Sequence, residues 1–165
     1  MKFELKELHM GMGQAEWEMY QDIPVKEPGS TNLCKGLPLE VFPSYLESQI
    51  ARKFQFVSYY DTPTITYLLY AGEKPVGYIG IRTQIDDNWR KWSGNIYYTV
   101  RQSQRGKGYG TQMLKLELEE CRKLGMVEVY TNASAGNLAS ARVIEKNGGI
   151  FLEDIEGSRY YKILL

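Results

Sequence analysis

The chain has 165 residues, of which 43% are hydrophobic and 13% aromatic, so it can bury a core and form one domain over residues 1–165. Lysine plus arginine and aspartate plus glutamate both number 20, and this zero net charge argues against a general nucleic-acid or anionic-membrane binder. The sequence holds no run of 18 apolar residues and no signal-peptide core, so we expect a cytoplasmic protein without a membrane span.

The first third of the chain predicts one strand, two helices and a long loop. Lys2–Leu8 alternates polar and apolar residues, as a strand does, and Gly13–Asp22 predicts a short helix. Pro24–Pro38 is rich in Pro, Gly, Ser and Asn and predicts a loop, and a loop of this length is often functional. Phe42–Ile50 has the apolar spacing of an amphipathic helix, with Pro43 in its first turn.

A hairpin and a polar loop follow in the middle of the chain. The strands are predicted at Ile65–Ala71 and Val76–Thr83, joined by a turn. The loop Gln84–Asn95 carries two tryptophans, Trp89 and Trp92. Large aromatic side chains in a polar loop often contact ligands, so both are candidates for binding a substrate, with packing onto the sheet as the alternative.

The second half alternates strands and helices. A strand at Ile96–Val100 leads into a glycine-rich stretch, and an amphipathic helix then ends at Gly125. A strand at Val127–Thr131, a helix capped by Asn137 and a C-terminal hairpin over residues 150–165 complete the chain. This order predicts an α/β fold (an α+β mixed sheet), with one sheet of about six to seven strands and helices on both faces.

We expect no catalytic or metal-binding function from the cysteines, the histidine or the acidic residues of the long helix. Two cysteines, Cys34 and Cys121, and one histidine, His9, are too few for a Cys/His zinc site, so we expect no metal. We also expect no structural disulfide, and a surface position for His9. The acidic residues of the long helix are expected on its solvated face: Glu117, Glu119 and Glu120.

Three glycines alternate at the junction between a predicted strand and a predicted helix: Gly106, Gly108 and Gly110. The first N–H groups of a helix have no internal partner, and the helix dipole adds partial positive charge there. Glycine lets the backbone curl so that these groups converge on a ligand. Arg105 and Lys107 add full positive charge. The stretch therefore predicts a site for phosphate or pyrophosphate.

The spacing of these glycines separates three families of phosphate-binding loops. The Walker pattern fails because no Ser or Thr follows Lys107, and the dinucleotide fingerprint fails because its third glycine comes one residue later. The pattern Q/R-x-x-G-x-G/A fits Arg105–Gly110 at every position. A second element, "GNLASARVIEKNGG" at Gly136–Gly149, opens the next helix after the next strand. On these two elements the chain resembles the GNAT-type N-acetyltransferases, which use acetyl-CoA, over at least Ile65–Phe151.

The resemblance implies how acetyl-CoA is held. Backbone N–H groups of the glycine loop bind the pyrophosphate, Val100 offers main-chain hydrogen bonds to the pantetheine and the acetyl carbonyl, and Asn137 approaches the pantetheine. The strands Ile96–Val100 and Val127–Thr131 are parallel and splay apart, with the thioester in the cleft between them. The implied cofactor-binding residues are Val100, Arg105, Gly106, Lys107, Gly108, Tyr109, Gly110, Thr111 and Asn137.

The sequence departs from the family at the acid and base positions. Relatives often place a tyrosine, the general acid, where this chain has Ile144, and some place a Glu or His base where it has Gly94 or Ile96. Tyr98 shares the strand face of these two positions and is our candidate catalytic residue near the thioester. The base is left open between a water chain and an acid from another element, such as Asp86, Asp87, Glu16 or Glu18.

The resemblance implies an acetyl-CoA-dependent N-acetyltransferase. The acetyl group would move to a primary amine, on a small molecule or a peptide, by direct attack in a ternary complex. The alternative is a GNAT-fold sensor or scaffold that binds acyl-CoA without turnover. O-acetylation and transfer of a longer acyl chain also stay open. Edge strands of the predicted sheet could pair in a homodimer.

Overall fold

The computed structural model describes residues 1–27 and 30–165. Its strands are β1 Phe3–Glu7, β2 Lys26–Glu27, β3 Ser30–Thr31, β4 Thr64–Ala71, β5 Lys74–Arg82, β6 Ile96–Val100, β7 Glu128–Ser134, β8 Ile150–Ile155 and β9 Ser158–Leu164. Its helices are α1 Gln14–Gln21, α2 Phe42–Ala51, α3 Asp87–Trp92, α4 Tyr109–Lys123 and α5 Leu138–Lys146. Short 3₁₀ turns lie at Leu39–Val41, Arg52–Phe54 and Gln102–Gln104.

The strands form two sheets where one mixed sheet was expected. One sheet has the order β1-β4-β5-β6 and the other β7-β9-β8, and within the described residues every strand ladder is antiparallel. β6 and β7 meet only near their starts, where Asn95 N donates to the Tyr130 carbonyl at 2.7 Å and Thr131 Oγ1 to the Ile96 carbonyl at 3.3 Å. Beyond these contacts the two sheets diverge, as expected for a splayed pair of strands.

β6 and β7 run in the same direction. α4 follows β6 and α5 follows β7, and the N-terminal residues of both helices line one cavity. Both strands therefore lead toward that cavity. The fold thus places two helix N-termini and two strand ends around a single space.

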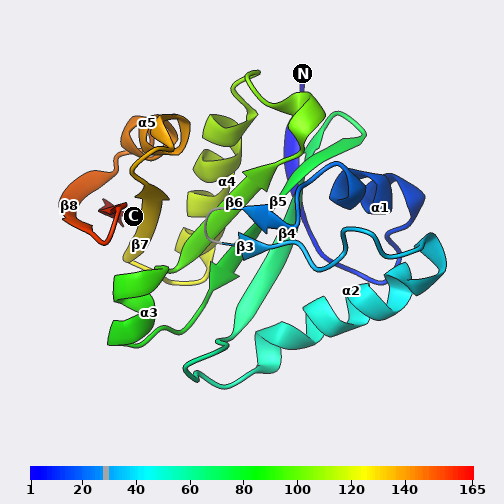
Figure 1. Cartoon of the computed structure of the whole chain (residues 1–165), viewed down its shortest axis with the longest axis horizontal. Coiled ribbons are helices and arrows are strands. Elements are labelled where there is room, and N and C mark those ends of the chain that lie inside the picture. The colour runs from blue at the N-terminus through cyan, green and yellow to red at the C-terminus, as the bar shows by residue number, and fades with distance from the viewer. Residues whose placement is uncertain (28–29) are drawn as a thin grey trace.

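Helices cover both faces of the larger sheet, as the element order predicted (Figure 1). Alternate residues of β4 divide between the faces: Leu68 and Tyr70 pack with α1 and α2, and Leu69 packs with α4 and α5. Met19 and Leu46 are fully buried on the first side, and Met113 and Ile144 on the second. Among the described residues, no helix is both long and apolar enough to cross a bilayer.

Two predicted loops contain regular structure. The Pro24–Pro38 segment holds the short hairpin β2–β3, and its residues Pro28 and Gly29 lie outside the described residues. The Gln84–Asn95 segment holds α3, which begins because the Asp86 side chain accepts a hydrogen bond from Trp89 N at 2.9 Å. Both elements are short, and their hydrophobic pattern is too brief to distinguish them from a loop.

The expectation that Glu117 is solvated is wrong. Its side chain is fully buried, because Glu117 lies three residues after Leu114 and four before Cys121, on the core-facing stripe of α4. Glu119 is exposed and Glu120 half-buried. His9 is exposed, as predicted, and both cysteines are free and buried.

Candidate active site

The glycine loop presents a row of unpaired donors. Gly106 and Gly108 have φ of +76° and +78°, a region that favours glycine, and Gly108 is the N-cap of α4. The backbone N–H groups of residues 106–110 find no hydrogen-bond partner within the described chain. These donors, at the positive end of the α4 dipole, form a cradle for an anion.

The third glycine has a different function. A Cβ at Gly110 would lie 3.5 Å from Val143 Cγ2 and 3.9 Å from Tyr98 Cε2, which is ordinary contact distance. The fold itself therefore does not require glycine at this position. Since Gly110 lines the cavity, its missing side chain leaves room for a ligand.

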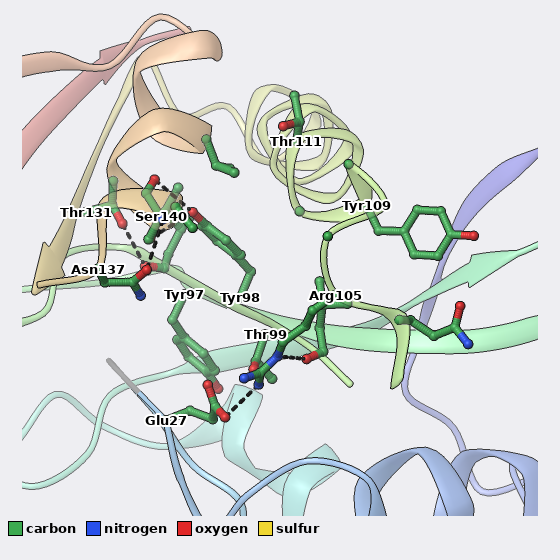
Figure 2. A pocket seen from close by; sticks show the side chains of 18 of the residues that line it. Glu27, Tyr97, Tyr98, Thr99, Arg105, Tyr109, Thr111, Thr131, Asn137 and Ser140 are labelled. Carbon is green, nitrogen blue, oxygen red and sulfur yellow. Dashed lines mark hydrogen bonds and ion pairs between the residues drawn. The ribbon is translucent and has the colours of Figure 1, made fainter. Parts of the chain in front are cut away.

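A cavity of about 460 Å³ lies between β6, β7 and the starts of α4 and α5, within the usual range for a small-molecule site (Figure 2). Eight of the nine predicted cofactor-binding residues line it: Val100, Arg105, Gly106, Gly108, Tyr109, Gly110, Thr111 and Asn137. Lys107 is the exception. It is exposed and donates to Gln104 Oε1 at 2.8 Å.

Tyr98 lies on the wall of this cavity beside the start of α5. Its hydroxyl hydrogen-bonds Ser140 Oγ at 3.0 Å, and Asn137 Oδ1 caps the helix by accepting from Ser140 N at 3.1 Å (Figure 2). Burial raises the pKa of Tyr98 to about 12, although the hydrogen bond with Ser140 opposes the shift. Tyr98 therefore stays protonated near neutral pH and can donate a hydrogen bond. Ile144, at the position of the family's tyrosine, is buried in the core.

Arg105 links the glycine loop to β2. Its Nε donates to the Val100 carbonyl at 2.9 Å, and its Nη2 donates to Glu27 Oε1 at 2.7 Å (Figure 2). The Glu27 side chain is only 12% exposed. This charged pair holds the β2–β3 hairpin against the end of β6.

Asp22, at the end of α1, ties down the segment before the glycines. Its Oδ2 accepts from Arg101 Nε at 2.7 Å and from Ser103 Oγ at 2.5 Å, and its carbonyl accepts from Gln102 N at 3.1 Å. Burial alone would raise the pKa of Asp22, but the hydrogen bonds from Ser103 and Arg101 outweigh it and lower the pKa. These contacts fix the entry into the glycine loop.

A second cavity, of about 710 Å³, adjoins the first. The two share Glu27, Ser93 and Tyr97 on their walls. Tyr97 and Tyr98 point to opposite sides of β6, so the strand separates the two spaces (Figure 2). Segments before Ile65 and the 84–95 segment line this cavity.

The two tryptophans occupy different environments. Trp89 lines the second cavity, where its Nε1 donates to the Ser58 carbonyl at 2.7 Å. Trp92 is 47% exposed and lines neither cavity, and its carbonyl accepts from Asn132 Nδ2 at 2.8 Å. Substrate contact by Trp92 stays a prediction without support from this geometry.

Glu27 is the acidic residue that sequence reasoning missed. The four acids considered as a base are engaged elsewhere. Glu16 accepts from Tyr70 and Glu18 from Gln14. Asp86 accepts from Trp89 N and Asp87 from Arg90. None of the four lines either cavity. Glu27 lines both, and its position in a long Pro/Gly-rich loop gave no signal beyond its carboxylate.

The family model for the "Acetyltransferase (GNAT) domain" matches residues 38–150, well over half of the chain. The chain belongs to the GNAT acetyltransferase family. The resemblance inferred from the glycine motif is therefore confirmed, and the GNAT protein is an acyltransferase by family. A search of the curated proteins by sequence found no match.

Solved GNAT structures share the fold over nearly the whole chain. An acetyltransferase from Salmonella typhimurium that modifies the N-terminal serine of the 50S ribosomal subunit protein L7/L12 is 16% identical, with a TM-score of 0.67, covering 99% of this chain and 95% of that one. A chimera of the spermidine N-acetyltransferase SpeG from Vibrio cholerae with hSSAT is 14% identical, with a TM-score of 0.65 and coverage of 99% and 96%. The N-acetyltransferase PseH of Campylobacter jejuni, in complex with acetyl coenzyme A, is 13% identical, with a TM-score of 0.61 and coverage of 99% for both chains.

Proposed function

We propose that this GNAT protein transfers an acetyl group from acetyl-CoA to a primary amine by direct attack in a ternary complex. The observation that carries the proposal is the row of unpaired N–H groups at residues 106–110, on a cavity that adjoins a second one across β6. One cavity suits the cofactor and the other the acceptor. Because β6 and β7 splay apart, a cofactor and an acceptor bound in the two cavities could meet at one point.

The residues of the first cavity fit coenzyme A. The loop donors and the α4 N-terminus would hold the pyrophosphate, with Thr111 beside them. β6 is an edge strand on this side, since no ladder joins it to β7 in the part of the chain described. Its main-chain groups on this edge are therefore available to the pantetheine, apart from the Val100 carbonyl, which accepts from Arg105 Nε. Asn137 Nδ2, which has no partner in the described residues, faces the same cavity.

Bound acetyl-CoA supplies an activated thioester that a neutral amine attacks directly. The chain contributes positioning and a hydrogen bond donor. Tyr98, held protonated beside Ser140, would donate to the thiolate sulfur as charge develops there. A free thiol has a pKa of about 8.5, so the CoA thiolate can leave without first taking a proton from Tyr98.

Glu27 is our candidate for receiving the proton of the amine. An alkyl amine is mostly protonated at neutral pH, so a proton acceptor must lie near the point of attack. Glu27 lies on the wall common to both cavities, where Arg105 holds one of its oxygens. Its other oxygen is available to an amine or to an intervening water.

Thiol release from acetyl-CoA, measured against a panel of amines, tests the proposed function. We expect release that depends on an amine. Tight CoA binding with no release from any amine would instead indicate a sensor, although a cavity that is open and lined by Tyr98 and Glu27 favours an enzyme. Formation of an ester or of a longer acyl amide from the corresponding donors would redefine the acceptor atom or the acyl length.

A further inference from the structure

The second cavity has an uneven balance of charge. In the described part of the chain its charged lining residues are Lys26, Glu27, Arg52, Asp61 and Arg82. Both carboxylates are already paired: Glu27 Oε1 lies 2.7 Å from Arg105 Nη2, and Asp61 Oδ1 lies 2.9 Å from Arg52 Nη2. A substrate with several positive charges would therefore find no carboxylate on this wall that is not already neutralised by an arginine.

The cations of this wall outnumber its carboxylates. Arg82 is only 6% exposed, donates to the Gly94 carbonyl at 3.0 Å and lies 4.6 Å from the centre of the Tyr97 ring. Its positive charge is thereby fixed in the wall. Lys26 is exposed on β2, and within the described residues its ammonium group has no partner. Lys26 can thus receive negative charge without losing an internal contact, and Arg82 adds a fixed positive charge nearby.

Half of the uncharged residues on this wall are aromatic: Tyr20, Tyr45, Tyr60, Tyr78, Trp89 and Tyr97. Such rings provide flat apolar surface and, at the tyrosines, hydroxyl donors. Tyr78 and Tyr97 meet edge to face at 6.4 Å between ring centres. The apolar surface suits a substrate body that is itself flat and apolar.

We propose that the acceptor is a primary amine that also carries an anionic group, a carboxylate or a phosphate, on an apolar or aromatic body, and that polyamines are excluded. This inference rests on the proposed function, since it names the acceptor of that same site. The amine would lie at the shared wall beside Glu27. Arg52 and Lys26 line only the second cavity, so they are placed to receive the anionic end.

Three amines with one body test the charge preference: p-(aminomethyl)benzoate, its primary amide and p-xylylenediamine. They present a carboxylate, a neutral amide and an ammonium group at the same position. We expect kcat/KM for the carboxylate to exceed that for the amide by about tenfold or more, as for one hydrogen bond to a charged group, and the diamine to react least. p-(Aminomethyl)phenyl phosphate then distinguishes a phosphate from a carboxylate preference.

Two variants test the assigned partners. Arg52→Gln and Lys26→Gln should each raise KM for the benzoate about threefold to tenfold more than KM for the neutral amide. Lys53→Gln is the matched control, because Lys53 pairs with Glu7 at 2.9 Å outside both cavities. An Arg52 variant that misfolds would lose CoA affinity, and Lys26, which is exposed, then decides the question.

The outcomes of the two proposals are distinguishable. Equal use of the three amines, or preference for the diamine, would overturn the charge inference and leave the transferase intact. A rise in KM for the neutral amide as large as that for the benzoate would also overturn it. Absence of thiol release with every amine would overturn the proposed function, and with it the inference.

Discussion

Glu117 is a fully buried carboxyl on α4, and neither of its oxygens has a hydrogen-bond partner in the described residues. Burial raises the pKa of Glu117 well above its ordinary value, and the charge of Arg82 opposes the shift only in part. The folded protein therefore favours the neutral form of this side chain. Below the ordinary pKa of a carboxyl, Glu117 is protonated in both states, so its titration does not change stability there. As the pH rises, the unfolded state ionises and gains stability relative to the folded one.

We expect Glu117→Met to stabilise the fold by about 1–3 kcal/mol near pH 7, since it removes an unpaired buried polar group with little change of volume. The gain should grow between about pH 5 and about pH 8, because the variant lacks the titration. Denaturant unfolding at the two pH values measures this. Glu119→Met, on the exposed side of the same helix, is the control and should change stability by less than about 0.5 kcal/mol. A gain that does not depend on pH would contradict the assignment of a neutral Glu117.

At the scale of elements, one substitution at the start of α5 can separate an observed helix cap from a proposed contact with CoA. Asn137 caps the helix through its Oδ1, and its Nδ2 is the group proposed to face CoA. Asn137→Asp keeps a capping oxygen but loses the donor, so the melting temperature should stay near that of the parent while CoA binds about tenfold more weakly.

Asn137→Ala loses both groups and should cost about 1 kcal/mol of stability as well as CoA affinity. Calorimetric titration with CoA and thermal unfolding measure the two effects separately. If the Asp variant binds CoA as tightly as the parent, the role of Asn137 is confined to capping. Figure 2 shows the side chain beside Ser140, where both functions meet.

At the scale of the whole molecule, the cofactor cavity lies where the two sheets part. Few hydrogen bonds join them there, among them Asn95 N to the Tyr130 carbonyl and Tyr130 N to Asn95 Oδ1 at 3.0 Å. A ligand that contacts both α4 and α5 would hold the sheets together. Saturation with CoA at about 100 times its Kd should stabilise the fold by about 2.7 kcal/mol and raise Tm by about 5–10 °C.

Thermal unfolding of the protein with increasing CoA measures this linkage. Adenosine at the same concentration, which lacks the pyrophosphate and pantetheine, is the control and should shift Tm much less. A CoA-independent Tm would contradict a site that spans the two sheets.

The elements that the sequence predicts best are those with a local signal. β6, the glycine loop and the Asn137 cap follow from strand alternation, unpaired helix donors and a capping side chain, all of which involve neighbouring residues. The division into two sheets could not be predicted in this way, since it depends on which strands share a ladder. β9 pairs between β7 and β8, and the other edge of β7 meets β6 through a few hydrogen bonds at Tyr130 and Thr131 without forming a ladder.

In the candidate site, too, features that depend on neighbouring residues were predicted, and features that depend on residues far apart in the sequence were not. Cofactor contacts in the glycine loop were predicted by motif, whereas Glu27 reaches the site only because Arg105, 78 residues later, holds it there. The burial of Glu117 was not predicted, because a charged side chain is usually exposed. Its helical spacing from Leu114 and Cys121 places it on the buried face of α4. Tertiary contacts thus decided what composition and short patterns left open.

The most direct measurement of the central claim is CoA binding by calorimetry to a matched pair of variants, Gly108→Trp and Gly125→Trp. Both glycines have φ of +78°, both have open space at the Cβ position, and they flank opposite ends of α4. The backbone strain is therefore similar, and only Gly108 lines the cofactor cavity. We predict that Gly108→Trp abolishes CoA binding and that Gly125→Trp retains it. Equal binding by both variants, or no CoA binding by the parent protein, would contradict a pyrophosphate cradle in this loop.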